Sequence, residues 1–323
     1  MAGPTGQRQG PATDRRSVLA LEREAVNLVD KMPELLMEAD RIASTVAHGI
    51  HGRRRAGPGE TFWQFRQYQP GEAANLVDWR RSASSDHLFV REREWEAAHT
   101  LHLWPDLSPS MNFQSHLSQT SKRDRVLVLM LAAAELLVRG GERVALMGQT
   151  APSASRNTAT KIAERIVTDS YADMRRKSRP PKAVLSRFSG LIMFSDFLAP
   201  PAAIRERLEM LAGSGVTGHL VQVLDPAEET LPYSGRTEFY GPSGRERWVA
   251  DRAETLRPRY KARFEAHRSE VAEIARRFDW SFLVHHTDRP ASEPLLSLLM
   301  RLQGSAGGYR WMGASSDATE RAQ

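Results

Sequence analysis

Aspartate and serine side chains alternate in one short segment of the chain, and a second aspartate follows another apolar run further along. Asp106, Ser108 and Ser110 stand after the first run, and Asp196 stands after the second. At alternate positions of an extended loop, side chains point the same way. Carboxylate and hydroxyl oxygens are hard ligands that suit Mg²⁺ or Mn²⁺. The pattern therefore predicts one metal site built from these four residues.

A metal ion held partly by hydroxyl groups keeps much of its positive charge, because these ligands are neutral. A vacant coordination position on such an ion can accept a carboxylate from outside the chain. Taken alone, residues 106–110 are equally typical of a helix N-cap and turn, where Asp and Ser are favoured. The metal prediction therefore depends on Asp196 lying beside this segment.

The elements that must position these side chains are short apolar runs alternating with helical segments. The runs are typical of strands buried on both faces. They cover residues 101–104, 144–147, 191–194, 220–224 and 282–284. Helical patterns cover residues 122–139, 160–174, 202–212, 256–278 and 292–302. This alternation predicts an α/β fold with a doubly wound, mostly parallel sheet, whose carboxyl edge binds ligands.

The chain before the first apolar run has a different character. Residues 17–48 carry a helical pattern with a break expected at Pro33, and residues 60–96 are rich in aromatic and β-branched side chains. We therefore predict an N-terminal helical and β-rich extension before the α/β domain. The predicted parts are a disordered lead (1–16), the extension (17–96), the α/β domain (97–303) and a loose tail (304–323).

Composition indicates a globular protein, with 41% hydrophobic and 26% charged residues. The chain has no cysteine, which excludes disulfides and thiolate zinc sites and suits a reducing compartment. No run approaches the roughly 18 apolar residues of a membrane span, so we expect a cytoplasmic protein. The net charge of +6 comes mostly from arginines scattered among glutamates. The dense clusters Arg53–Arg55 and Arg175–Arg179 fit surface loops better than a nucleic-acid site.

The segment DLSPSM, residues 106–111, resembles the DxSxS element of the metal-ion-dependent adhesion site in von Willebrand factor A domains. Asp196 stands where that family has its last aspartate ligand. The resemblance also implies a threonine ligand in the loop that opens an intervening helix. Thr160 fits the phase of that element best, and Thr158 is the second choice.

The stretch from GPGETFWQFRQYQPGE to NLVDW and HLFVREREWE resembles family 58 of the domains of unknown function. Glu72 replaces a usual aspartate, and Ala83-Ser84 replaces a common Ala-Arg pair. The resemblance spans roughly residues 49–302. It implies a von Willebrand A-like domain, which we expect to bind proteins rather than to catalyse a reaction. It also implies a MoxR-type AAA+ ATPase as partner, acting with this chain on a client protein in maturation or stress response.

Two other functions remain as alternatives. A magnesium-dependent phosphohydrolase could use Asp106 as nucleophile, although Ser108 stands where one phosphatase class has a second aspartate. A nucleic-acid-binding protein would use the basic charge. The sequence shows no Ser-His-Asp order, P-loop or dinucleotide fingerprint, so we expect no enzyme.

The β-rich segment is too short to bury a core of its own. We therefore predict that residues 60–96, expressed alone, remain unfolded. Circular dichroism during heating tests this expectation, and a cooperative transition of the fragment would contradict it.

Overall fold

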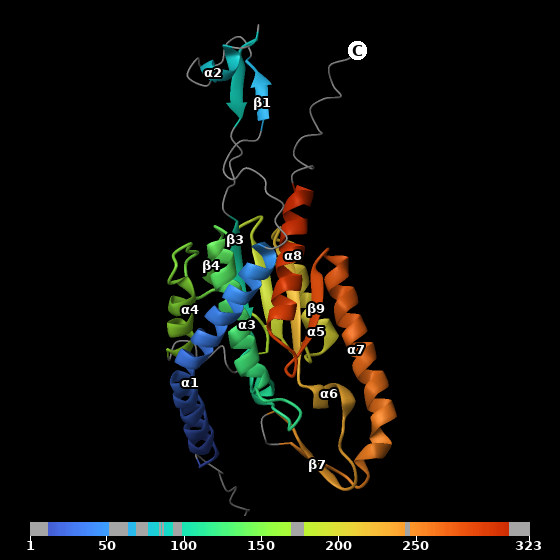
Figure 1. Ribbon diagram of the computed structural model, residues 1–323. Coiled ribbons are helices and arrows are strands. Elements are labelled where there is room, and N and C mark those ends of the chain that lie inside the picture. Colours follow the sequence, from blue (N-terminus) through green and yellow to red (C-terminus); the bar gives the residue numbers. More distant parts are fainter. Residues whose placement is uncertain are drawn as a thin grey trace, which may run out of the picture. The chain divides into compact units, whose positions relative to one another are not determined.

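The five apolar runs form the strands of one parallel sheet in the computed structural model (Figure 1). The strand order is β4-β3-β5-β6-β9, and every neighbouring pair is parallel. The strands are β3 (Thr100–Pro105), β4 (Arg143–Leu146), β5 (Gly190–Ser195), β6 (Thr217–Leu224) and β9 (Ser281–His286). The predicted α/β class with a mostly parallel sheet is confirmed.

The structure describes residues 12–51, 64–68, 77–83, 85, 87–92, 99–168, 178–242 and 246–309. The chain divides into two units, one of residues 1–49 and 99–323, the other of residues 50–98. The basic cluster Arg53–Arg55 and most of Arg175–Arg179 lie outside the described residues. Among the described residues, no helix combines the length and apolarity needed to cross a membrane.

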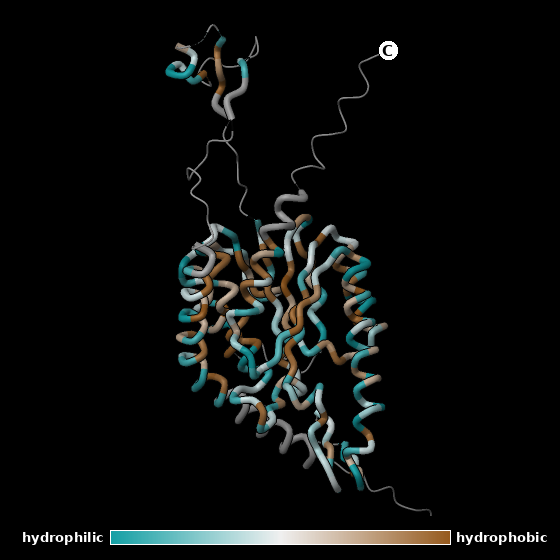
Figure 2. The backbone as a smooth tube through the Cα atoms, turned by 45° about the vertical axis from the view of Figure 1, so that its right-hand side comes forward, coloured by the Kyte–Doolittle hydropathy of each residue, from teal (hydrophilic) through white to brown (hydrophobic). Residues whose placement is uncertain are grey.

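Helices cover both faces of the sheet, so that the apolar strands lie between more polar outer surfaces (Figure 2). One face packs against α3 (Lys122–Arg139), which also contacts α4 (Thr158–Val167) and α8 (Ser292–Tyr309). The other face packs against α5 (Pro201–Ala212) and α7 (Arg257–Arg277). Burial of the strands on both sides explains their continuous apolar character.

The first helix, α1 (Ala12–His51), belongs to the sheet-containing unit. The break expected at Pro33 is absent, because the helix runs through this residue. Apolar side chains on both sides of the proline are buried, namely Leu28, Met32, Leu35, Ala39 and Ile42. Packing of this face offsets the hydrogen bond that proline removes. Ion pairs of Lys31 with Asp124 at 2.9 Å and of Asp40 with Arg139 at 2.7 Å tie α1 to α3.

Both ends of the sheet-containing unit differ from the predicted boundaries. Helix α1 already begins at Ala12, inside the predicted lead of residues 1–16. Helix α8 continues to Tyr309, past the start of the predicted tail at residue 304. Because α1 belongs to the sheet-containing unit, the predicted extension of residues 17–96 is divided between the two units. Residues 1–11 and 310–323 lie outside the described part.

In the smaller unit, the described residues form an antiparallel pair, β1 (Gln64–Gln67) and β2 (Phe89–Glu92), and one helical turn, α2 (Trp79–Ser82). Asp78 caps this turn by accepting a hydrogen bond from the Arg81 amide at 3.0 Å. Between β6 and α7, the larger unit adds α6 (Pro226–Thr230) and the hairpin β7 (Thr237–Tyr240) and β8 (Arg247–Ala250). A turn of 3-10 helix, Ala253–Leu256, follows the hairpin.

Two buried histidines should make the stability of the fold depend on pH. Burial lowers the pKa of His219, on β6, from 6.5 to about 4, and that of His285, on β9, to about 3. Below pH 6.5 the unfolded chain therefore binds protons that the folded chain refuses, so stability falls as the pH drops towards 4. For His219 alone this loss between pH 7 and 5 is about 2 kcal/mol.

We predict that His219→Gln loses less unfolding free energy than the wild type between pH 7 and 5, by about 2 kcal/mol. Urea unfolding at several pH values measures this difference. His116→Gln is the matched control, because His116 is exposed and lies in a loop. If the unfolding free energies of the wild type and His219→Gln fall equally between pH 7 and 5, the prediction is contradicted.

Candidate functional site

The carboxyl ends of β3 and β5 are neighbours at the point where the chain reverses its direction of winding. From β3 the chain adds β4 on one side of the sheet, and it then returns to add β5 on the other side. Ligands of open parallel sheets bind outside the strand ends at such a switch point. Asp106 follows β3 and Asp196 follows β5, so the fold brings both carboxylates to this position.

The carboxylate of Asp106 is fully buried and held by two donors. Its Oδ1 accepts the Ser108 amide at 2.9 Å, and its Oδ2 accepts the hydroxyl of Ser195 at 2.7 Å. Burial and the charge of Asp196 raise the pKa of Asp106 to about 6, although the serine hydrogen bonds oppose this shift. A carboxylate placed in this way is costly unless a positive charge lies nearby.

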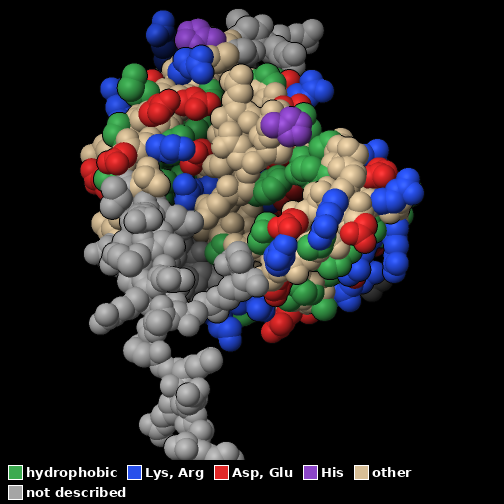
Figure 3. Space-filling view, turned by 90° about the horizontal axis from the view of Figure 1, so that it is seen from below, with side chains coloured by type: hydrophobic (Ala, Val, Ile, Leu, Met, Phe, Trp, Pro, Cys, Tyr) green, Lys and Arg blue, Asp and Glu red, His purple; other side chains and the backbone are tan. Residues whose placement is uncertain are grey.

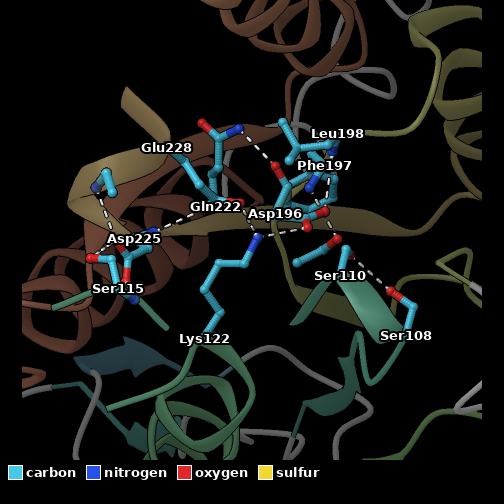
Figure 4. A network of polar contacts seen from close by, with 12 residues as sticks. Ser108, Ser110, Ser115, Lys122, Asp196, Phe197, Leu198, Gln222, Asp225 and Glu228 are labelled. Atoms are coloured by element: carbon cyan, nitrogen blue, oxygen red, sulfur yellow. Dashed lines mark hydrogen bonds and ion pairs between the residues drawn. The ribbon is translucent and has the colours of Figure 1, made fainter. Parts of the chain in front are cut away.

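Ser108 and Ser110 present their hydroxyl groups beside this carboxylate. Their Oγ atoms are 3.2 Å apart, at the start of a 3-10 turn (Pro109–Asn112) in which Met111 is fully buried (Figure 4). Two adjacent ligands of an octahedral Mg²⁺ ion, each about 2.1 Å from the metal, are separated by about 3 Å. The spacing of the two hydroxyls therefore suits a pair of adjacent ligands.

Asp196 is held by a strained turn directly after β5. Its Oδ1 accepts the Leu198 amide at 3.2 Å, and its carbonyl accepts the side-chain amide of Gln222 at 2.8 Å. Phe197 adopts the left-handed conformation with φ of 50°, which costs about 1–2 kcal/mol for a bulky residue. Two contacts stabilise this conformation. The Phe197 side chain is buried, and its backbone amide donates a hydrogen bond to the Ser195 hydroxyl.

Lys122 supplies the positive charge beside these carboxylates. It is the first residue of α3, fully buried, and its Nζ lies 3.0 Å from Asp196 Oδ2 and 2.5 Å from Glu228 Oε1. Burial alone would lower the pKa of Lys122, but the two carboxylates hold it above its ordinary value. Burial also raises the pKa of Glu228, against the opposing effect of Lys122.

Helix α6 brings a third strand end into the same network. Asp225 follows β6, caps α6 and accepts both the amide of Ser115 at 2.8 Å and its hydroxyl at 2.5 Å. Glu228 lies one turn further along and also accepts the Asp225 amide at 3.0 Å. Lys122, Asp225 and Glu228 are not among the site residues predicted from the sequence. Two signals were available: an aspartate directly after a buried strand, and a lysine at a helix N-terminus, where the dipole disfavours positive charge.

The structure does not bring the predicted threonine to this site. Thr160 is exposed in the first turn of α4. Thr158 is buried, but its hydroxyl donates to the Ser155 carbonyl at 2.5 Å and lies 3.2 Å from the hydroxyl of Ser153. The first turn of α4, which contains both threonines, therefore lies beside the loop that precedes the helix.

That loop returns along β4 towards the amino ends of the strands. Ser153 pairs with Val144, and Val144 lies opposite Leu101, near the start of β3. Asp106 follows Leu101 by five residues, a distance of about 16 Å at the rise of a strand. The chain thus reverses direction after β4, and this reversal keeps the first turn of α4, with both threonines, away from the carboxyl edge.

Four of the five predicted ligands therefore meet at one edge: Asp106, Ser108, Ser110 and Asp196. Over the described residues, no cluster of three or more His, Asp or Glu side chains is spaced to hold a metal. The candidate set has two carboxylates and two hydroxyls, so it depends on neutral oxygens and water to complete a coordination shell. Its donor chemistry and its hydroxyl spacing suit Mg²⁺ or Mn²⁺.

The hydrogen bond from Ser195 to Asp106 gives a test of this geometry. We predict that Ser195→Ala lowers the free energy of unfolding by about 1–3 kcal/mol, because a buried carboxylate loses a donor. Ser214→Ala is the control, since the exposed Ser214 hydroxyl bonds only within its own helix end at 3.3 Å. Urea unfolding of both variants measures the difference, and a Ser195→Ala protein as stable as the control would contradict the geometry.

The chain is similar in sequence to several bacterial proteins and in structure to two solved proteins. It is 27% identical over 290 residues to uncharacterised proteins of Mycobacterium tuberculosis and Mycobacterium bovis, covering 82% of this chain and 87% of theirs. Among solved structures, it is similar to the conserved hypothetical protein BatB of Bacteroides thetaiotaomicron and to an aerotolerance-related membrane protein of Bacteroides fragilis. Both structures are 14% identical, have TM-scores of 0.38 and 0.39, and cover 64% of this chain and 100% of theirs.

The strongest of these findings is a family match that covers more than half of the chain. Residues 64–270 match the family described as protein of unknown function DUF58. The matched segment includes β1 and β2 of the smaller unit and the three strand ends that carry Asp106, Asp196 and Asp225. The chain belongs to the DUF58 family.

Proposed function

We propose that this chain is a non-enzymatic protein-binding module, whose von Willebrand A-like domain holds Mg²⁺ or Mn²⁺ at the carboxyl edge of the sheet. The observation that carries the proposal is the meeting of Asp106, Ser108, Ser110 and Asp196 at the switch point. An ion bound there would retain an open coordination position. A carboxylate from a partner protein is the ligand that such a position accepts.

The surroundings of the site support binding rather than catalysis. Both oxygens of the Asp106 carboxylate accept hydrogen bonds, and its side chain is fully buried. A nucleophile in a phosphohydrolase must instead reach the phosphorus atom of its substrate. Ser110, by contrast, is partly exposed and can face a partner.

The face shown in Figure 3 gives no support to the nucleic-acid alternative. On the face shown in Figure 3, basic and acidic side chains are interspersed. Proteins that bind nucleic acids gather Lys and Arg into a patch or stripe. A partner protein with an acidic residue at its contact point fits the site better.

We further propose that the partner is a MoxR-type AAA+ ATPase, which the resemblance of the sequence implies. The ATPase would supply the energy for work on a client protein. This chain would supply the recognition surface, with the metal ion as the contact point. The proposal places this protein in the cytoplasm, where such an ATPase has access to ATP.

We predict that Asp106→Ala abolishes both Mg²⁺ binding and capture of the ATPase, while the fold stays intact because the loop lies at the sheet edge. Calorimetric titration measures metal binding, and surface plasmon resonance without nucleotide measures capture. The control is Asp251→Ala, which removes an exposed carboxylate after β8. The ATPase itself should retain its nucleotide turnover.

Chelation of the metal alone is ambiguous, because the ATPase also needs Mg²⁺. The test of the metal bridge is therefore the binding of the Asp106→Ala variant to the ATPase. A folded Asp106→Ala protein that captures the ATPase as tightly as the Asp251→Ala control would overturn the metal-bridge proposal.

A further inference from the structure

Lys122 is placed where a cation is needed whether or not a metal ion is bound. Its Nζ contacts two carboxylates, that of Asp196 after β5 and that of Glu228 on α6 (Figure 4). The lysine side chain has no exposed surface, and the Asp196 side chain is only 2% exposed. Water therefore contributes little to the solvation of these charges, and the ammonium group must compensate them.

In the view of Figure 4, Asp196 lies between Lys122 and the hydroxyl pair of Ser108 and Ser110. One Asp196 oxygen accepts a hydrogen bond from the Lys122 ammonium, and the other accepts one from the Leu198 amide. Asp196 is also close enough to Asp106 for its charge to act on that carboxylate. An ion beside Ser108 and Ser110 would thus share Asp196 with an ammonium group already in place.

From this arrangement, we propose that Lys122 is the resident counter-ion of the edge and sets its affinity for divalent metal ions. In the metal-free protein, Lys122 neutralises Asp196 and Glu228, so that the edge folds without a divalent ion. When an ion arrives, the positive charge of Lys122 repels it and keeps binding weak and reversible. The second part rests on the proposed metal-binding function, whereas the first part is independent of it.

Reversible binding suits a site that must exchange partners. Without Lys122, the edge would hold uncompensated buried carboxylates, and the fold would depend on a divalent ion for part of its stability. With Lys122, the ion is free to enter or leave as a partner carboxylate binds. Lys122 thus supplies the positive charge that the fold needs, and the metal ion is needed only for binding the partner.

The first experiment tests the counter-ion in the presence of a chelator. Thermal unfolding is followed for the wild type, Lys122→Met, Asp196→Asn and the double variant. The control is Lys161→Met, which removes an exposed lysine of α4. Lys122→Met should lower Tm by on the order of 10 °C, because it leaves buried charges without a partner. The double variant should recover at least half of this loss.

The double variant decides the outcome if Lys122→Met alone does not fold. A folded double variant then supports the pairing of Lys122 with Asp196. A double variant no more stable than Lys122→Met overturns this pairing. A Lys122→Met protein with the Tm of the Lys161→Met control also overturns the counter-ion role.

The second experiment measures Mn²⁺ binding by electron paramagnetic resonance, with the metal alone as probe. Lys122→Met should bind Mn²⁺ at least about tenfold more tightly than the wild type, since a neighbouring positive charge is gone. Added Mn²⁺ should also raise the Tm of Lys122→Met more than that of the wild type. Lys161→Met should match the wild type in both measurements.

The two claims fail in distinguishable ways. If the wild type binds Mn²⁺, Asp106→Ala does not, and Lys122→Met binds no more tightly than the wild type, the role of Lys122 in affinity is overturned and the metal site stands. If neither the wild type nor Lys122→Met binds Mn²⁺, the proposed metal function is overturned together with that role. The counter-ion role is then decided by the unfolding experiment alone.

Discussion

Buried carboxylates at one end of a parallel sheet are the constraint on which this structure depends. Three strand ends deliver Asp106, Asp196 and Asp225 to the same edge, and α6 adds Glu228. Their mutual repulsion would open the edge unless donors and positive charge opposed it. An amide donor holds each aspartate, and serine hydroxyls also hold Asp106 and Asp225. The buried ammonium of Lys122 pairs with the other two side-chain charges at the edge, those of Asp196 and Glu228.

The fold supplies these contacts from segments that are far apart in the sequence. Lys122 and Glu228 are separated by 106 positions, yet they form an ion pair because α3 and α6 start at the same edge of the sheet. Backbone strain at Phe197 is maintained by the surrounding core and directs the turn that carries Asp196. Strain of this kind is found at binding sites, where the fold overrides local preference.

The sequence predicted the fold well, because strands buried on both faces leave continuous apolar runs, and each of the five runs became a strand. Asp106 and Asp196 were predictable for the same reason, since they follow such runs. Thr160 was misplaced because its position depends on the reversal of the chain after β4, which leaves no periodic pattern. The position of Lys122 at a helix N-terminus was a signal, but its burial could not be predicted, because the carboxylates that pair with it come from distant segments.

The central claim is that a divalent ion binds between the two serine hydroxyls and the paired aspartates. Anomalous diffraction from crystals soaked in Mn²⁺ tests this claim directly. The account predicts one strong peak within about 2.1–2.3 Å of the Oγ atoms of Ser108 and Ser110, beside Asp106 and apart from the Lys122 ammonium. An edge without a peak at millimolar Mn²⁺, in crystals where Lys122 still bridges Asp196 and Glu228, would contradict it.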